Sequence, residues 1–243
     1  MDYPVLGMGS RSLKNRILGA ATGGLISGGD GIPVVNALRG VSFKLQEGDR
    51  LGLIGHNGAG KSTLLKVLAG IYQPTAGVLA TTGRIVSTLN ISLGMQPEAT
   101  GIENIIARGL LLGMRKKEIY KKLSDITDFT ELGDYLEMPV RIYSSGMATR
   151  LAFATVTSMS AEILLMDEVI GAGDAAFIDK AEKRLNEFMT RSNILVLASH
   201  SEAMIRKFCN KALLLAQGKV LGIGDVGEMF SLYKDRSATG VQA

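Results

Sequence analysis

The stretch GHNGAGKST, residues 55–63, decides the fold of this 243-residue chain. It follows a short apolar run at 50–54, which is typical of a strand, and it leads into residues 61–69, whose apolar positions repeat with a helical period. The pattern G-x-x-x-x-G-K-[ST] between a strand and a helix indicates a phosphate-binding P-loop. A plain glycine-rich turn is the alternative, but all four fixed positions and both flanking elements agree with the motif.

Each position of this loop has an expected role. The glycines allow backbone N–H groups to wrap around a phosphate chain, and the following helix adds its positive end. Lys61 is expected to reach the β- and γ-phosphates, and the Ser62 hydroxyl is expected to coordinate Mg²⁺. His56 holds a variable position and also fits a loop residue that faces solvent. Nucleotide contacts are predicted from Gly55, His56, Asn57, Gly58, Ala59, Gly60, Lys61, Ser62 and Thr63.

Polar side chains follow two further apolar runs. Asp167 and Glu168 come directly after residues 163–166, and His200 follows residues 194–198. In a parallel sheet, ligands bind beyond the carboxyl ends of the strands. We therefore predict that Asp167 holds Mg²⁺ through water, that Glu168 acts on the attacking water, and that His200 approaches the γ-phosphate. Taken alone, the acids also fit a solvated loop start and the histidine a cap or core position.

The pattern along the chain predicts an α/β fold with a largely parallel sheet. Strands are expected at 50–54, 163–166, 194–198 and 212–215, helices at 177–191 and 201–208, and a half-buried strand at 41–46. Residues 102–158 carry charged helical patterns and are predicted to form a helical insertion. Residues 12–18 suit a short amphipathic helix, residues 19–32 a glycine-rich flexible loop, and residues 236–243 a frayed tail.

Composition excludes several function classes. No apolar run approaches the roughly 20 residues that a spanning helix needs, and the first residues do not resemble a secretion signal. The single cysteine, Cys209, fits a reducing compartment. The net charge of +4 comes without a basic stripe interleaved with aromatic residues, so we expect no nucleic-acid partner.

A second motif brings in a family resemblance. Tyr143-Ser144-Ser145-Gly146-Met147 opens an apolar helix predicted at 147–159 and resembles the signature motif of ABC transporter nucleotide-binding domains. An ordinary helix N-cap is the alternative for this pentapeptide taken alone. The resemblance covers about residues 34–235. It implies a single ABC ATPase domain over 1–243, with a RecA-like, mostly parallel sheet core (about 1–97 and 159–243), a small antiparallel β part, and a helical signature subdomain (about 98–158).

The resemblance also assigns partners and further contacts. It implies a homodimer in which each ATP lies between one P-loop and the partner's signature residues, here Ser144, Ser145, Gly146 and Met147. Asp174 matches the acidic position of the loop that faces the partner. The adenine-stacking aromatic is assigned to Tyr3, although the strand that usually precedes it is missing. The Mg²⁺-touching glutamine is assigned to Gln96, which is displaced from the expected position near 90–91.

A narrower resemblance concerns the transported substrate. The YSSGM motif, the run GDAAF at 173–177 and TGIENI at 100–105 are similar to the ATPase subunits of polysaccharide exporters. That likeness implies ATP-driven export of O-antigen, capsule or a related glycan, from the cytoplasmic face of the inner membrane. A multi-span permease would dock on the helical insertion and make most of the glycan contacts, and no room is expected for an additional sugar-binding domain. A lipid or drug exporter ATPase and a soluble ABC-type ATP switch are the alternatives.

Overall fold

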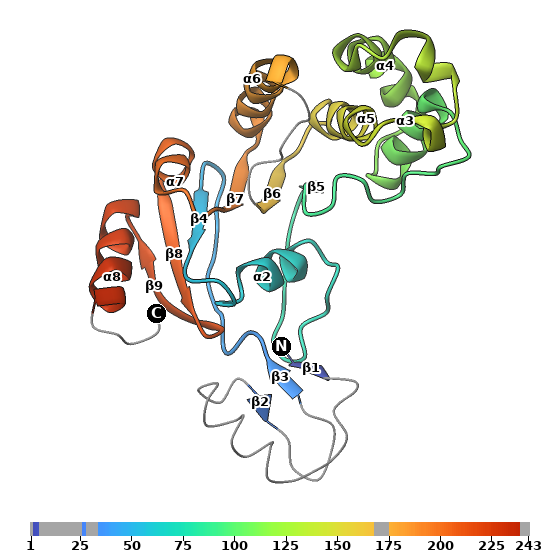
Figure 1. The fold of residues 1–243 in the computed structure, drawn as a ribbon. Helices are drawn as coiled ribbons and strands as arrows, with labels where there is room; N and C mark the ends of the chain where they lie inside the picture. The colour runs from blue at the N-terminus through green and yellow to red at the C-terminus, as the bar shows by residue number, and fades with distance from the viewer. Residues whose placement is uncertain (1, 5–25, 28–33, 168–174, 239–243) are drawn as a thin grey trace. The chain divides into compact units, whose positions relative to one another are not determined.

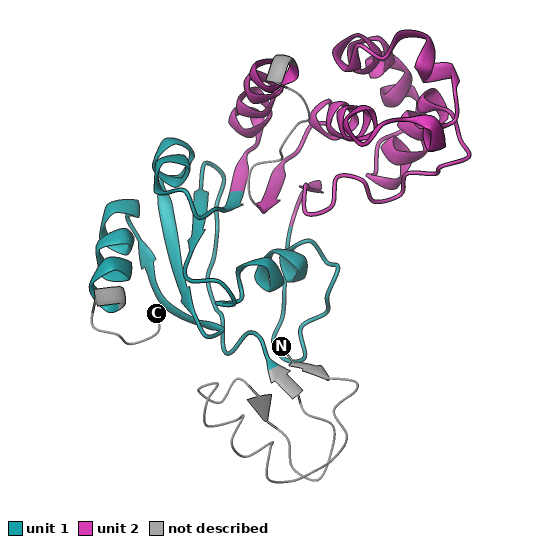
Figure 2. Cartoon of the chain, viewed as in Figure 1, with its two compact units in different colours: residues 1–81, 196–243 teal, residues 82–195 magenta. Residues whose placement is uncertain are grey.

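The computed structural model describes residues 2–4, 26–27, 34–167 and 175–238. The chain divides into two compact units, which Figure 2 colours separately. Unit 1 comprises residues 1–81 and 196–243, and unit 2 comprises residues 82–195. Figure 1 labels the helices and strands of both units.

Unit 1 contains one side of the main sheet. Its strand order is β7-β4-β8-β9, with β4 at Arg50–Ile54, β8 at Lys211–Ala216 and β9 at Lys219–Gly224. Strand β7, Ile194–Ala198, crosses the boundary between the units. Strands β4 and β8 are parallel, and β8 and β9 are antiparallel. The last four residues of β4 are buried, which explains why this strand consists of an apolar run.

Three helices and a small sheet complete the described part of unit 1. The helices are α2 (Lys61–Leu68), α7 (Glu202–Phe208) and α8 (Val226–Ala238). A Cβ atom on Gly52 would lie 2.6 Å from a methyl carbon of Ile205, so glycine in β4 allows α7 to pack closely. The small sheet is antiparallel, in the order β1-β3-β2, with β1 at Asp2–Pro4, β3 at Val34–Asn36 and β2 at Ile26–Ser27.

Unit 2 combines a short stretch of parallel sheet with most of the helices. Strand β5 (Ile85–Ser87) pairs in parallel with β6 (Ile163–Asp167), and β7 follows β6 in the strand order. The helices are α3 (Gly101–Leu111), α4 (Lys116–Thr130), α5 (Ser145–Thr157) and α6 (Ala175–Arg191), with 3₁₀ turns η1 (Gly133–Glu137) and η2 (Val140–Ile142). Helix α3 packs on both α4 and α5.

Asn104 fixes the entry to the first helix of unit 2. Its side chain is fully buried, accepts the N–H of Gln96, and donates toward the carbonyls of Gln96, Ala99 and Thr100 at 2.9–3.1 Å. Thr100 and Glu103 form a reciprocal capping box at the same helix start. One amide side chain therefore satisfies the backbone of the turn that leads into α3.

The predicted α/β class, with a mostly parallel sheet and a small antiparallel part, is confirmed. Strands β4 and β7 match the predicted ranges, while β6, β8, α6 and α7 differ by one or two residues at their ends. Helices α4 and α5 fall within the helical insertion expected at 102–158, and α3 begins one residue before it. The division into core and signature subdomain stays a prediction. Among the described residues, no helix has both the length and the apolarity to cross a bilayer.

Other expectations were wrong. Residues 41–46 form no strand, although their exposure alternates as expected, because alternation specifies a buried face and not a hydrogen-bonded neighbour. Residues 26–27, within the predicted loop, form strand β2, and helix α8 continues to residue 238, into the predicted tail. Helix α5 begins at Ser145 rather than Met147. The helix predicted at 12–18 lies outside the described residues.

Replacing Asn104 with alanine should destabilise the protein by about 2–3 kcal/mol, because buried backbone groups lose their hydrogen-bond partners. Urea denaturation followed by circular dichroism measures this change. Glu98→Gln is the matched control, since it removes only an exposed ion pair with Arg141 and should cost less than about 1 kcal/mol. Equal losses in the two variants would contradict the role given to Asn104.

Candidate functional site

The loop between β4 and α2 adopts a backbone that only glycine accommodates at two positions. Gly55 and Gly60 have φ angles of 144° and 110°. A Cβ on Gly55 would lie 2.2 Å from the carbonyl oxygen of Leu215, and one on Gly60 would lie 2.9 Å from that of Ala37. Both glycines of the motif are therefore required by close contact with neighbouring backbone.

The back of the loop is hydrogen-bonded to the turn between β8 and β9. Ala59 is fully buried, and its carbonyl accepts the N–H of Gly218 at 2.9 Å. The carbonyl of Gly218 in turn accepts the N–H of Arg39 at 2.7 Å. A Cβ on Gly218, whose φ is 78°, would lie 2.6 Å from the carbonyl oxygen of Ala37. Two segments distant in the sequence, 37–39 and 215–218, thus hold one short loop in shape.

Lys61 places a buried cation inside the loop. Its side chain belongs to a residue that is only 8% exposed, and its Nζ donates to the carbonyls of Gly55 at 2.6 Å and His56 at 3.0 Å. The first N–H groups of any helix have no acceptor within the helix. In α2 the N-cap residue is Gly60, which has no side chain to accept from them. Fixed positive charge and helix dipole therefore coincide, as an anion site requires.

The remaining loop residues lie around this cation. Asn57, Gly58 and Ser62 are exposed, and Thr63 is half-buried. His56 turns toward the loop, with its Nδ1 2.6 Å from the carbonyl oxygen of Asn57. Its Nε2 is buried and has no hydrogen-bond partner among the described residues. The imidazole of His56 is therefore part of the loop structure and does not simply face solvent.

His200 lies in a second part of unit 1. It follows β7 and is exposed, between two serines that shape the backbone. The Oγ of buried Ser199 accepts the N–H of Ser201, and the Oγ of Ser201 accepts the N–H of Met204 and caps α7. The strand end that carries His200 is thus fixed by local hydrogen bonds.

Unit 2 carries most of the other predicted residues, and two of them lie outside the described part. Asp167 is the last residue of β6 and is half-buried. Gln96 is exposed, and its backbone is held by Asn104. Tyr3, in unit 1, lies in β1 opposite Val35. Glu168 and Asp174 fall outside the described residues, as does the side chain of Tyr3.

The signature residues open helix α5. Ser144 is its N-cap and accepts the N–H of Met147 at 3.2 Å, so the predicted N-cap interpretation is correct. Ser144 and Ser145 are nevertheless exposed. A Cβ on Gly146 would find its nearest described neighbour, the Oγ of Ser144, at 3.8 Å. Capping and an accessible hydroxyl at a helix start are therefore both present here.

An aromatic cluster ties the start of α5 to the start of α6. The Arg150 guanidinium lies 4.5 Å from the centre of the buried Phe177 ring. Phe177 meets Phe129 edge-on at 5.1 Å, and Phe129 stacks on Phe153 at 5.9 Å. The Arg184 guanidinium lies 4.3 Å from the centre of the Phe129 ring. The signature helix and the helix after Asp174 are thus packed on one cluster.

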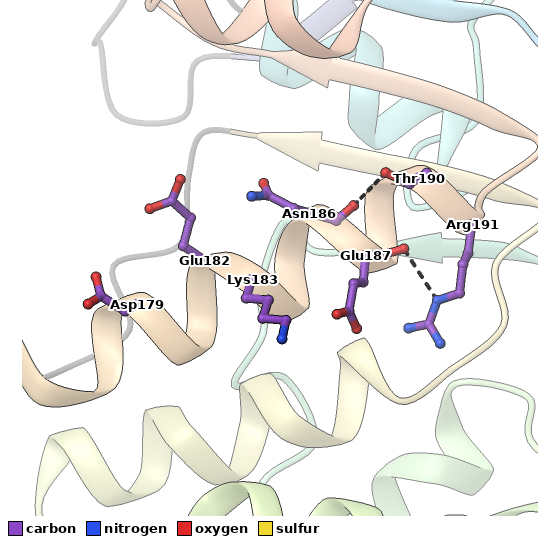
Figure 3. A pocket seen from close by; sticks show the side chains of 7 residues that line it. All are labelled: Asp179, Glu182, Lys183, Asn186, Glu187, Thr190 and Arg191. Atoms are coloured by element: carbon purple, nitrogen blue, oxygen red, sulfur yellow. Dashed lines mark hydrogen bonds between the residues drawn. The ribbon is translucent and has the colours of Figure 1, made fainter.

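A cavity of about 710 Å³ lies along α6, and no predicted site residue lines it. Figure 3 shows that its walls are polar side chains of this one helix, with Thr190 bonded to the backbone of Asn186 and Arg191 to that of Glu187. Its lining includes Asp179, Glu182 and Lys183 but no convergent set of groups. We therefore place the candidate site at the loop around Lys61.

Comparison with known proteins identifies the family. The sequence profile described as ABC transporter matches residues 38–171, just over half of the chain. This chain belongs to the ABC transporter family. It is 48% identical over 221 residues to an O-antigen export system ATP-binding protein of Yersinia enterocolitica, covering 90% of this chain and 92% of that protein. It is 38% identical to a teichoic acids export ATP-binding protein of Bacillus anthracis, covering 82% of this chain but 36% of that longer protein.

A solved structure supports the same fold. The dimeric, post-hydrolysis form of an ATP-binding cassette bound to ADP and Pi has a TM-score of 0.61 at 20% identity, covering 79% of this chain and 92% of that one. The predicted P-loop NTPase fold and the predicted family are therefore confirmed, including the polysaccharide-exporter ATPase subfamily. The nucleotide of this ABC protein is ATP.

Sequence reasoning missed the residues that support the phosphate loop from behind. Gly218 and Ala37 contact the loop through their backbones, and the N–H of Arg39 bonds to Gly218. Gly218 carries a detectable signal, since it follows Gln217 in a turn between two apolar strands. Ala37 carries none, because any residue can supply a carbonyl oxygen. Among the described residues, no cluster of three or more histidine, cysteine or acidic side chains forms a ready metal cage.

Gly218→Ala should lower ATP affinity about tenfold or more, because the new methyl group displaces Ala37 and shifts the phosphate loop. Isothermal calorimetry with ATP measures the effect. The matched control is Gly40→Ala, at a φ of 59° where a Cβ would meet no described atom within 4 Å. That control carries only backbone strain, so a comparable loss of affinity in it would refute the proposed support.

Proposed function

We propose that this chain is the ATP-binding and ATP-hydrolysing subunit of an ABC exporter that moves a cell-surface polysaccharide across the cytoplasmic membrane. The observation that carries the proposal is the glycine-built loop around buried Lys61. It occurs in a chain whose Yersinia relative, matched over nine-tenths of its length, is named for O-antigen export. O-antigen or a related glycan is therefore the proposed cargo.

The loop supplies the phosphate contacts in this proposal. Backbone N–H groups of residues 55–63 and the Lys61 ammonium bind the phosphate chain, in place of the carbonyls that Lys61 contacts in the structure. Asn57, Gly58 and Thr63 border the same loop. Tyr3 is proposed to stack on the adenine.

A magnesium ion is proposed beside the phosphates, with Ser62 and Asp167 among its oxygen donors. Ser62 offers an exposed hydroxyl on the first turn of α2, and Asp167 offers a carboxylate at a strand end. Oxygen donors of this kind suit Mg²⁺, which keeps several waters and takes its other ligands from phosphates. Gln96 is proposed as a further oxygen ligand. When bound, Mg²⁺ would neutralise phosphate charge during hydrolysis.

Two side chains are proposed to act on the reacting groups. Glu168 accepts a proton from the attacking water or orients it. His200 donates a hydrogen bond near the γ-phosphate, from a strand end whose backbone the flanking serines fix. Lys61 stabilises the charge on the leaving phosphates.

A second copy of the chain is proposed to complete the site. The chain holds one phosphate loop and one signature, and in this family each nucleotide needs one of each from opposite subunits. Exposed Ser144 and Ser145, with the space beside Gly146, give a phosphate access to the start of α5. Met147 follows in the same turn, and Asp174 is proposed to face the partner.

A membrane permease is the other proposed partner. The relatives are named as ATP-binding proteins of export systems. We infer that a separate membrane protein forms the path through which the substrate passes. We place the chain at the cytoplasmic face of the inner membrane, with the permease docked on the helical segment 98–158. Most glycan contacts are proposed to lie on the permease.

Lys61→Ala should lower ATP affinity roughly tenfold or more, since a charge-assisted contact to phosphate is lost. Calorimetry on the purified chain measures this. Lys66→Ala, in the last turn of the same helix, is the control and should bind ATP as the parent does. Unchanged ATP affinity in Lys61→Ala would exclude the loop as the phosphate site.

Glu168→Gln should leave ATP binding intact and lower turnover about 100-fold or more, because the proton acceptor is lost. Phosphate release measures turnover, and light scattering should show an ATP-dependent dimer accumulating. Glu182→Gln, an exposed acid on α6, is the control. Turnover of Glu168→Gln at the parent rate would remove this residue from the proposed chemistry.

Export itself tests the cargo. In a host whose own gene is deleted, the parent chain should restore surface polysaccharide and Glu168→Gln should not. Purification from membranes should recover the parent with a multi-span protein. A chain that turns over ATP but recovers no membrane protein would instead be a soluble ATP switch.

A further inference from the structure

The start of α4 holds an unusual concentration of positive charge. Residues 115–122, RKKEIYKK, contain five of the chain's 27 Lys and Arg and one of its 23 Asp and Glu. The segment therefore has a net charge of +4, which equals the net charge of the whole chain. Outside these eight residues the two signs balance. The basic character of the protein is thus a local property of one helix.

Four of these cations form no ion pair with a described residue. Arg115, Lys116, Lys117 and Lys121 are exposed, and in the described part of the chain none lies within ion-pair distance of an acid. We call these four the basic patch. Lys122 differs, because its Nζ donates to the carbonyl of Ser158.

The one acid in the segment does not neutralise the patch. Glu118 bonds to Arg84 at 3.1 Å, and that hydrogen bond, opposed by desolvation, keeps the pKa of its carboxyl below the usual value. Arg115 adds only a minor electrostatic contribution to Glu118. The positive charge of the patch is therefore directed to solvent.

Helix stability does not explain the patch. Cations at a helix N-terminus oppose the helix dipole, and Lys117 and Lys121 repel each other across one turn. No basic residue lies in the last turn of α4, where it would be favourable, while Asp125 and Asp128 lie in the C-terminal half. The charges are arranged against local stability, which points to a role outside the fold.

Large exposed apolar side chains lie close to these cations in the sequence. Leu110 and Leu111 end helix α3 and are 49% and 61% exposed, and Tyr120 on α4 is 51% exposed. Helices α3 and α4 pack on each other within unit 2 (Figure 1). The Lys116 Nζ lies 6.0 Å from the centre of the Tyr120 ring. Exposed cations, leucines and a tyrosine are thus combined within residues 110–121.

We propose that the basic patch, together with Leu110 and Leu111, is a contact surface for an anionic lipid bilayer. Lysines near such a surface are attracted to lipid phosphates, leucines enter the headgroup boundary, and tyrosine is favoured at that depth. Three of the four cations are flexible lysines rather than arginines held in a fixed fork, which suits a fluid headgroup layer. A single exposed tyrosine offers no row of stacking platforms for nucleic acid.

This inference goes beyond ATP-driven export, because the bilayer contact needs neither nucleotide nor permease. It uses only residues 110–121 of the segment 98–158 on which the permease is proposed to dock. The purified full-length chain should co-sediment with vesicles of phosphatidylcholine and phosphatidylglycerol, about three to one, and not with phosphatidylcholine alone. Raising the salt from about 0.1 M to about 1 M should release it, because the screening length falls from roughly 10 Å to 3 Å.

The triple variant Lys116→Gln, Lys117→Gln, Lys121→Gln should bind the mixed vesicles about a hundredfold more weakly, since each lysine contributes roughly a factor of five. A control triple, Lys44→Gln, Lys183→Gln, Lys219→Gln, removes the same charge from exposed positions elsewhere and should bind as the parent. Leu110→Ser with Leu111→Ser should weaken binding severalfold while keeping its salt dependence.

Three results would overturn the proposal: no binding of the parent to the anionic vesicles, undiminished binding of the patch variant, or equal loss in the control triple. If the parent does not bind vesicles and the patch variant recovers less permease than the parent, the proposal is wrong and the surface binds an acidic protein segment instead. ATP turnover of the soluble patch variant should equal that of the parent. Loss of ATP turnover in the patch variant would show that the substitutions damage the fold. Failed export by a parent chain that binds vesicles normally would count against the proposed function alone.

Discussion

The hydrogen bond from the Gly218 N–H to the Ala59 carbonyl is the contact on which the phosphate loop depends. A loop that offers several N–H groups to one anion must point its carbonyls elsewhere, and a buried carbonyl needs a donor. Ala59 is fully buried, so its carbonyl requires a partner behind the loop. That partner, Gly218, has a left-handed backbone conformation, and a Cβ added to it would lie within 3 Å of the Ala37 backbone, so glycine alone fits there. The requirement for glycine therefore extends beyond the motif to a turn far along the sequence.

The same geometry explains why a buried lysine is tolerated. An ammonium group removed from water needs close acceptors, and Lys61 has the carbonyls of Gly55 and His56 within 3.0 Å. These carbonyls are available because the glycine at position 55 turns the backbone inward at a φ of 144°. Phosphate oxygens carry full negative charge and are stronger acceptors than carbonyls. The loop is thus organised for an anion by the same contacts that stabilise its cation.

The sequence predicted what is encoded locally. The loop at 55–63, the strands at 50–54 and 194–198, and the start of α5 each depend on neighbouring residues, and the structure has them within two residues. Contacts made by backbone atoms from distant segments could not be predicted in this way. Ala37 acts through a carbonyl oxygen that every residue possesses, so its identity carries no signal. In residues 41–46 the alternation of apolar and polar side chains correctly predicted which of them are half-buried. It wrongly predicted that the segment pairs with a neighbouring strand.

In unit 2, packing links two segments that the sequence presents separately. Arg150 stands one turn after the signature, and Phe177 stands at the start of the helix that follows Asp174. Their contact is buried among Phe129 and Phe153, and the bidentate pair between Arg184 and Asp125 closes it on the other side. Well-packed interiors do not deform continuously, since a small gap already forfeits much of the contact energy. A shift of α5 at Arg150 therefore has to be followed by α6 at Phe177, and the signature helix and α6 are mechanically coupled within this unit.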